Sequence, residues 1–144
     1  MRMLIALILL GCCVACTKPE APASQPAAET PKETGLERIP EADPSKYPKM
    51  GELAGWKNPQ LVVREDGFGL VDLENHEVHI LTLEQIPAEL VSLPETAWPY
   101  GRVVLVSPAM PAGASEQTKT RLRENRGLLI GTLKELQVRP YAVP

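Results

Sequence analysis

The most reactive side chains of this 144-residue chain are gathered near its N-terminus. Its three cysteines, Cys12, Cys13 and Cys16, all lie in the segment LLGCCVACTK at residues 9–18. A cysteine thiolate is a nucleophile that can be acylated, oxidised or bound to a metal. An apolar run at residues 4–10 precedes them, with Arg2 in front of it. This run is too short for a membrane-spanning helix, which needs about 20 apolar residues, and it is typical of a secretory signal peptide.

Two of these cysteines follow residues that suit removal of a signal peptide. Residues 9–11 (LLG) precede Cys12, and residues 13–15 (CVA) precede Cys16. The segment resembles the lipobox of bacterial lipoproteins, in which an aliphatic residue, a small or aliphatic residue and Gly or Ala precede a Cys. The resemblance implies that this Cys is diacylated, that the signal is cleaved before it, and that its new amino group is acylated. We expect Cys16 to be the anchor because more apolar sequence lies behind it; Cys12 is the alternative.

The choice of anchor decides what remains after cleavage. With Cys16 as anchor, residues 1–15 are the signal peptide and no free thiol remains, which suits an oxidising compartment. With Cys12, the two later cysteines remain and can pair or be acylated. Three acyl chains hold a protein stably on a membrane. Thr17 stands where many inner-membrane lipoproteins have Asp, so the resemblance implies the outer membrane, with the protein facing the periplasm.

The two histidines are the candidate metal ligands. His76 and His79 have Glu74 and Glu77 beside them, and two imidazoles with a carboxylate can bind zinc. In a strand, however, an odd spacing places the two side chains on opposite faces, so we interpret both as surface residues. The chain also has no G-x-S-x-G motif and no glycine-rich phosphate loop. We therefore expect neither an enzyme nor a bound cofactor.

A basic stripe follows the long helix expected at residues 115–137. The residues that share it are Lys119, Arg123, Arg126 and Lys134. Such a stripe can dock an acidic partner or anionic headgroups, or it can simply be a solvated flank. Gly127 and Gly131 lie four apart in the same helix and each costs about 1 kcal/mol relative to Ala. We expect them to allow close approach of a backbone, either of the sheet beneath or of a second protein.

Aromatic residues in loops are further candidates for a binding surface. Trp98 and Tyr100 lie in the loop WPYG, and Trp and Tyr are favoured in protein interfaces. Together with Tyr141 they can also rim a concave pocket for a small ligand or a cell-wall fragment. The sequence leaves both alternatives open.

Composition divides the chain into three parts. Residues 17–48 hold seven of the 15 prolines and few large apolar residues, so we expect residues 16–48 to be a lipidated cysteine and a disordered tether. Residues 49–144 then form one small domain. Without the signal peptide, 14 Lys and Arg stand against 18 Asp and Glu, and this net charge near −4 argues against nucleic-acid binding.

The sequence of this domain predicts a small α+β fold, a two-layer sandwich of a mixed or antiparallel sheet with two helices. Strands are expected at residues 60–65, 68–73 and 77–81, and the Asp66-Gly67 dipeptide predicts a hairpin between the first two. A short helix follows at residues 87–93, then a buried strand at 103–106, the long helix and an edge strand at 138–143. The order is β-β-β-α-β-α-β.

The run VVREDGFGLVDLENHEVHILTLEQIPAEL, with the strand, helix and strand after it, resembles the small periplasmic domain of ExbD/TolR-type envelope proteins. That family keeps a transmembrane helix with an embedded acidic residue, whereas residues 4–10 contain no acid. The proton-coupled role therefore does not carry over. The resemblance implies a domain that dimerises or binds envelope partners.

These observations predict a lipid-anchored, noncatalytic module that binds or positions a protein of the bacterial cell envelope. A homodimer is a further expectation. The two alternatives are a ligand- or cell-wall-binding lipoprotein and a small metal-dependent enzyme centred on His76 and His79. A stoichiometric metal would favour the enzyme, and a thermal shift with peptidoglycan fragments would favour the ligand-binding protein.

Overall fold

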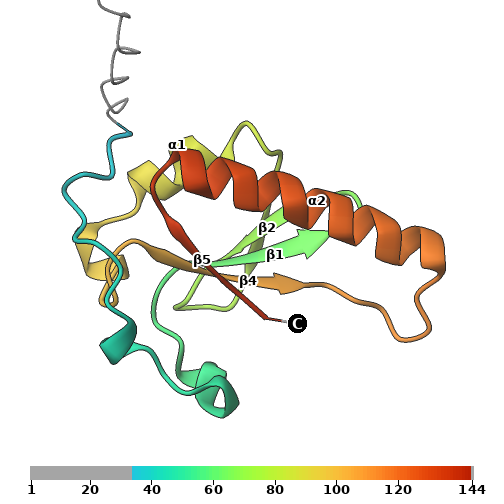
Figure 1. Cartoon of the computed structure of the whole chain (residues 1–144), viewed down its shortest axis with the longest axis horizontal. Coiled ribbons are helices and arrows are strands. Elements are labelled where there is room, and N and C mark those ends of the chain that lie inside the picture. The colour runs from blue at the N-terminus through green and yellow to red at the C-terminus, as the bar shows by residue number, and fades with distance from the viewer. Residues whose placement is uncertain (1–33, 144) are drawn as a thin grey trace, which may run out of the picture. The chain divides into compact units, whose positions relative to one another are not determined.

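The computed structural model describes residues 34–143 and contains one five-stranded mixed sheet with two α-helices (Figure 1). The sheet has the order β3-β2-β1-β4-β5. Its strands are β1 (Gln60–Arg64), β2 (Gly67–Val71), β3 (Val78–Leu81), β4 (Val103–Pro108) and β5 (Arg139–Ala142). The helices are α1 (Ile86–Ser92) and α2 (Glu116–Glu135), with short 3-10 helices η1 (Pro44–Lys46), η2 (Met50–Gly55) and η3 (Glu95–Ala97).

Two kinds of connection build the sheet. The antiparallel meander β1-β2-β3 has its first turn at Glu65-Asp66, between the paired residues Arg64 and Gly67, so the predicted hairpin is present with its turn one residue earlier than the Asp66-Gly67 dipeptide. The strands β1, β4 and β5 are parallel, and α2 connects β4 to β5. The predicted α+β class and the order β-β-β-α-β-α-β are confirmed, and β5 lies at an edge as expected. No helix among residues 34–143 has the length and apolar character to cross a membrane.

Both helices cover the same face of the sheet. Leu122, Leu129 and Leu133 of α2 are buried in one core with Leu61 of β1 and Leu90 of α1. Helix α2 packs on β1 and β5. It begins at Ser115, whose Oγ accepts a hydrogen bond from the N–H of Thr118 (3.1 Å). Residues 103–106 of β4 are buried on both faces of the sheet, as their unbroken apolar run predicts.

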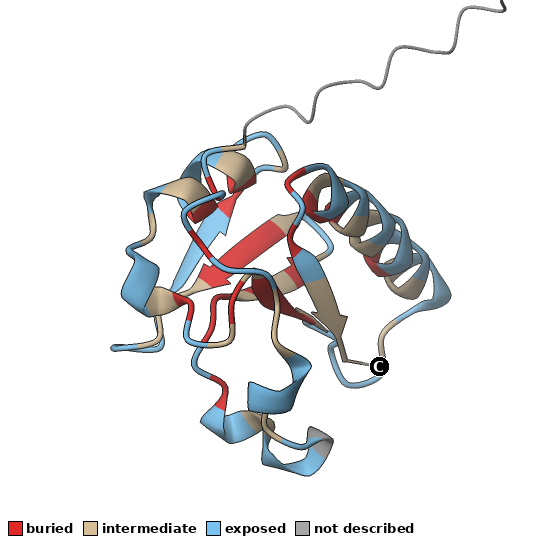
Figure 2. Ribbon diagram, turned by 60° about the vertical axis from the view of Figure 1, so that its left-hand side comes forward, coloured by how far each residue is buried: buried red, intermediate tan, exposed pale blue. Residues whose placement is uncertain are grey.

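The N-terminal part of the described chain belongs to the folded domain. Leu36 and Ile39 are 0% and 1% exposed and lie in the helix-side core. Tyr47 and Trp56 pack on the other face of the sheet, over Leu105 of β4. Figure 2 shows buried residues on the sheet and on the segment that leads into it. The tether boundary expected at residue 48 is therefore wrong for residues 34–48, because two buried aliphatic side chains and an aromatic one fix this Pro-rich segment to the sheet.

Asn58 and Gly101 shape the loop against which this segment packs. The buried amide of Asn58 donates to the carbonyls of Gly101 (2.7 Å) and Val103 (2.8 Å) and accepts from the N–H of Tyr100 (2.9 Å). Gly101 has a φ of +79°, and a Cβ there would lie 2.1 Å from the carbonyl oxygen of Glu41. Only glycine fits this position, since the chain passes directly against it.

Candidate protein-binding surface at the free edge of the sheet

Within residues 34–143, no segment covers half of one face of the sheet. The N-terminal segment packs over β4 and β5, where Trp56 contacts Val103 and Leu105. On the same face of β1, β2 and β3 the pairing register places apolar residues side by side, with Val71 opposite Val78. Val78 is 44% exposed and Ile80 is 56% exposed, which makes them two of the four exposed large apolar residues in the described chain. This face is therefore an apolar surface that ends at an open edge.

Strand β3 forms that edge, and half of its main-chain groups point away from the sheet. The N–H of Asp72 donates to the carbonyl of Glu77 (2.8 Å) at the start of the β2-β3 hairpin. In an antiparallel pair, hydrogen-bonded and non-hydrogen-bonded positions alternate. His79 and Leu81, opposite Leu70 and Phe68, therefore bond to β2, whereas the N–H and C=O groups of Val78 and Ile80 point outward.

This edge lacks the lysine and proline residues that often protect an edge strand. The opposite edge, β5, contains Arg139 and Pro140, and proline cannot donate to an added strand. The sequence of β3 is VHIL, without Lys or Pro. A free strand edge that carries exposed apolar side chains is a template for pairing with another chain.

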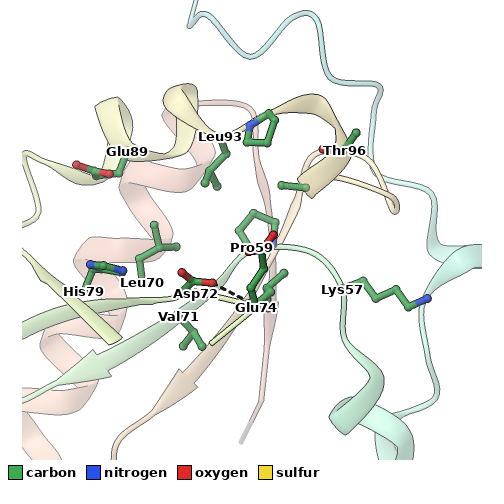
Figure 3. A pocket seen from close by; sticks show the side chains of 13 residues that line it. Lys57, Pro59, Leu70, Val71, Asp72, Glu74, His79, Glu89, Leu93 and Thr96 are labelled. Atoms are coloured by element: carbon green, nitrogen blue, oxygen red, sulfur yellow. Dashed lines mark hydrogen bonds between the residues drawn. The ribbon is translucent and has the colours of Figure 1, made fainter. Parts of the chain in front are cut away.

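A pocket of about 520 Å³ lies beside this edge on the helix side of the sheet (Figure 3). His79 faces this side because it pairs with Leu70, a core residue. Apolar residues, among them Leu70 and Leu93, line the pocket. Its charged or titratable lining residues are Lys57, Asp72, Glu74, His79 and Glu89. In Figure 3, His79 and Glu89 lie at one end of the pocket and Lys57 lies at the other.

The electrostatic character of this region is acidic. Three carboxylates line the pocket against one ammonium group, and Glu77 and Glu84 lie at the two ends of β3. Asp72 is fixed by the turn, since its Oδ1 accepts from the N–H of Glu74 (2.8 Å). The backbone N–H of Glu84 and the hydroxyl of Thr82 hold the pKa of the Glu84 carboxyl below its usual value. The edge therefore presents negative charge beside apolar side chains.

The histidines do not form a metal centre with neighbouring side chains. His76 lies in the β2-β3 turn with a φ of 60°, and His79 lies within β3. No group of three His, Cys, Asp or Glu side chains in the described part of the chain is arranged to hold a metal ion. This geometry favours the interpretation of both as surface residues.

The basic stripe lies on α2, the helix that packs over β1 and β5. The free edge is formed by β3, at the opposite end of the strand order from β5. Arg123 and Lys134 are exposed, and Lys119 and Arg126 are half-buried. Lys119 pairs with Glu116 within the helix (Nζ to Oε1, 2.7 Å). The stripe is thus accessible, but it is not brought together with the free edge at β3.

The glycines of α2 are open to solvent, whereas the predicted aromatic binding residues are divided between the two faces of the sheet. A Cβ at Gly127 or Gly131 would meet no atom within 4 Å, so the sheet does not approach these glycines, and the alternative of a second protein stays a prediction. Trp98 is only 3% exposed and lies in the helix-side core, so it does not contribute to a binding surface. Tyr100 lies with Tyr141 in the cluster on the other face. The expected pocket rimmed by Trp98, Tyr100 and Tyr141 is therefore not formed.

The sequence predicted the strand β3, but it did not predict that β3 lies at the edge of the sheet. The alternation of Val78 and Ile80 indicated one apolar face, and only the strand order shows that this face ends at an unpaired edge. The expected lipidation sites, Cys16 and Cys12, lie outside the described residues. No family model matches the chain, and neither a search of curated proteins nor one of solved structures finds a match.

Proposed function

We propose that this chain is a lipid-anchored module of the bacterial cell envelope that binds another protein through β3 and the adjoining sheet face, without catalysis. The observation that carries this proposal is the exposure of Val78 (44%) and Ile80 (56%) on a strand whose outer edge is unpaired. Apolar surface next to free main-chain groups favours an interface with a protein.

The N-terminal sequence supports the cellular setting. The signal-like run at residues 4–10 and Cys16 resemble a bacterial lipobox, and residues 17–33 separate that cysteine from the folded unit. We propose that acylation of Cys16 holds the protein on the outer membrane, where the domain faces the periplasm. The ExbD/TolR-like run contains β1, β2, β3 and α1, so the proposed surface lies within the part of the chain that carries this resemblance.

The basic stripe of α2 supports a second candidate surface. Arg123 and Lys134 are exposed, and Leu128 on the same helix is 56% exposed. An acidic partner could dock there. The two surfaces make different predictions, because each can be altered without touching the other.

The test uses two variants with matched exposure. Ile80→Lys places a charge on β3, and Leu128→Lys places the same charge on α2, where the replaced side chain is equally exposed at 56%. The full-length protein and both variants are purified from the native host in mild detergent, and the mass of the N-terminal peptide reports acylation. A partner that is retained by Leu128→Lys and lost by Ile80→Lys supports the proposal, provided that both variants melt at the wild-type temperature. Loss only with Leu128→Lys, or no specific partner at all, contradicts it.

A further inference from the structure

We propose that the partner contributes an extended segment of alternating apolar and basic residues, which adds to β3 as a sixth strand of the sheet. This inference rests on the proposed function and specifies the chemistry of its partner. Main-chain pairing supplies affinity in such complexes, and the alternating side chains supply specificity.

The main chain of β3 provides a defined set of hydrogen bonds. The N–H and C=O groups of Val78 and Ile80 point away from β2, as the register and the Asp72–Glu77 bond require. On the N-terminal side of Val78, Glu77 faces Asp72 of the hairpin, and His76 lies in the turn with its N–H donating to the carbonyl of Asp72 (2.9 Å). An added strand therefore pairs with the short stretch that begins at Val78.

The two faces of β3 require different side chains from that strand. Val78 and Ile80 extend the uncovered apolar face, so neighbouring side chains of the added strand on that face are apolar. His79 lies on the helix side, at the end of the pocket that also contains Glu89 (Figure 3). Side chains of the added strand next to His79 point toward this pocket, because neighbouring strands share their faces.

The charges around the pocket favour Arg or Lys at those positions. Asp72, Glu74 and Glu89 supply three carboxylates, and Lys57 supplies the one opposing charge at the far end. The apolar lining, including Leu70 and Leu93, suits the aliphatic stem of a long basic side chain. A basic head with an apolar stem is therefore the chemistry that fits this end of the edge.

Two other occupants fit less well. The chain's own residues 17–33 have four prolines and three glutamates, and proline removes main-chain donors while glutamate repels the acidic surroundings. A second copy would bring the carboxylates of Glu77 and Glu84 to the same edge, because both copies carry them. A basic segment of a different protein avoids both conflicts.

The experiment uses the full-length acylated protein in detergent micelles and a capped nine-residue peptide that alternates Val and Arg. A matched control peptide has the same sequence with N-methyl groups on alternate residues, so its charge is retained while its hydrogen bonding is blocked. A second control replaces Arg with Glu. Binding is followed by fluorescence anisotropy, and amide exchange is followed at Val78 and Ile80.

We expect the Val-Arg peptide to bind and to slow exchange at both amides, and we expect N-methylation to weaken binding by about tenfold or more, since several main-chain hydrogen bonds are lost. The double variant Glu74→Gln/Glu89→Gln should weaken binding several-fold at low salt, with Glu116→Gln/Glu124→Gln on α2 as its control.

Equal binding of the N-methylated peptide, equal binding of the Glu peptide, or no binding overturns the proposal. Protection of Val78 and Ile80 that depends on protein concentration without peptide also overturns it, because the occupant would then be a second copy. A partner lost by Ile80→Lys, together with a failed peptide test, leaves the proposed function standing and removes only the strand-addition mode.

Discussion

Val78 lies over Gly69 on the uncovered face of the sheet. A Cβ at Gly69 would come within 2.4 Å of Cγ1 of Val78. Valine has few alternative rotamers because it is β-branched, so the missing side chain at Gly69 determines where Val78 sits. The apolar surface at the free edge depends on this contact.

Gly69→Ala should therefore disturb β3 and the binding surface together. We expect the free energy of unfolding to fall by about 1–3 kcal/mol, as in overpacked sites. Urea denaturation measures this change, and partner binding should weaken in the same variant. An Ala variant with unchanged stability and unchanged partner binding would show that Val78 is not held by this contact.

Gly131→Ala should have the opposite effect. Gly131 lies inside α2, and a Cβ there meets no atom within 4 Å. Alanine in an exposed helix interior is more stable than glycine by about 0.5–1 kcal/mol, so we expect a rise of this size. Gly127→Ala serves as an independent repeat of the test. Destabilisation by both variants would indicate that another backbone packs closely on this face of α2.

Asn58→Ala should be among the most damaging single substitutions. The side chain of Asn58 is fully buried and makes three hydrogen bonds to the backbone around Gly101. Its removal leaves two carbonyls and one N–H without these partners, and we expect a loss of about 2–4 kcal/mol. Asn125→Ala is the control: its half-buried amide donates to the carbonyl of Arg64 (2.8 Å), so a loss of about 1 kcal/mol is expected. Equal losses for the two variants would contradict this account.

Ile39→Ala tests whether the N-terminal segment is part of the folded unit. Ile39 is 1% exposed in the helix-side core, and truncation of a buried Ile to Ala costs about 2–5 kcal/mol. Met110, which is 49% exposed, provides a control in which Met110→Ala changes stability by less than about 0.5 kcal/mol. If Ile39→Ala were as harmless as the control, residues 34–48 would belong to the tether after all.

The turn between β1 and β2 predicts a dependence of stability on pH. The guanidinium of Arg64 donates to Oδ1 of Asp66 (3.1 Å), and this bond is the main cause that lowers the pKa of the Asp66 carboxyl. The unfolded state therefore takes up a proton first as the pH falls. The contribution of this pair is complete above the ordinary Asp pKa, about 4, and is lost below it as the pH falls through the lower folded pKa.

We expect Asp66→Asn to reduce the loss of stability in acid. Urea denaturation between about pH 5 and pH 2 measures the effect, and Arg64→Gln should act in the same direction because it removes the partner. If the wild type and Asp66→Asn lost stability in parallel over this range, the turn carboxylate would have no part in acid unfolding.

Local patterns were sufficient to predict the elements of this fold. The Asp66-Gly67 dipeptide, the apolar run at residues 103–106 and the leucines of α2 each indicate their own structure through spacing or turn chemistry, although the hairpin turn itself lies at Glu65-Asp66. The order of the strands is different, because it depends on contacts between residues far apart in the chain. The sequence therefore predicted strand β3 without showing that it is the free edge.

Burial of single residues was the hardest feature to predict. Leu36 and Ile39 stand among prolines and charges, where composition indicates disorder, and two fully buried side chains outweigh that composition. Trp98 is flanked by Pro99 in a loop, which favours the surface, yet its ring fills the core below the helices. Neither outcome has a local signal, since each depends on a space that distant elements leave open.

Site-specific photocrosslinking in the native host shows directly whether β3 contacts a partner protein. A photoreactive residue is placed at Ile80 in one strain and at Leu128 in another, two positions that are each 56% exposed. We expect a discrete crosslinked product of higher mass from position 80 and little or none from position 128. A product from position 128 alone, or from neither position, would contradict the assignment of β3 as the edge that binds a partner protein.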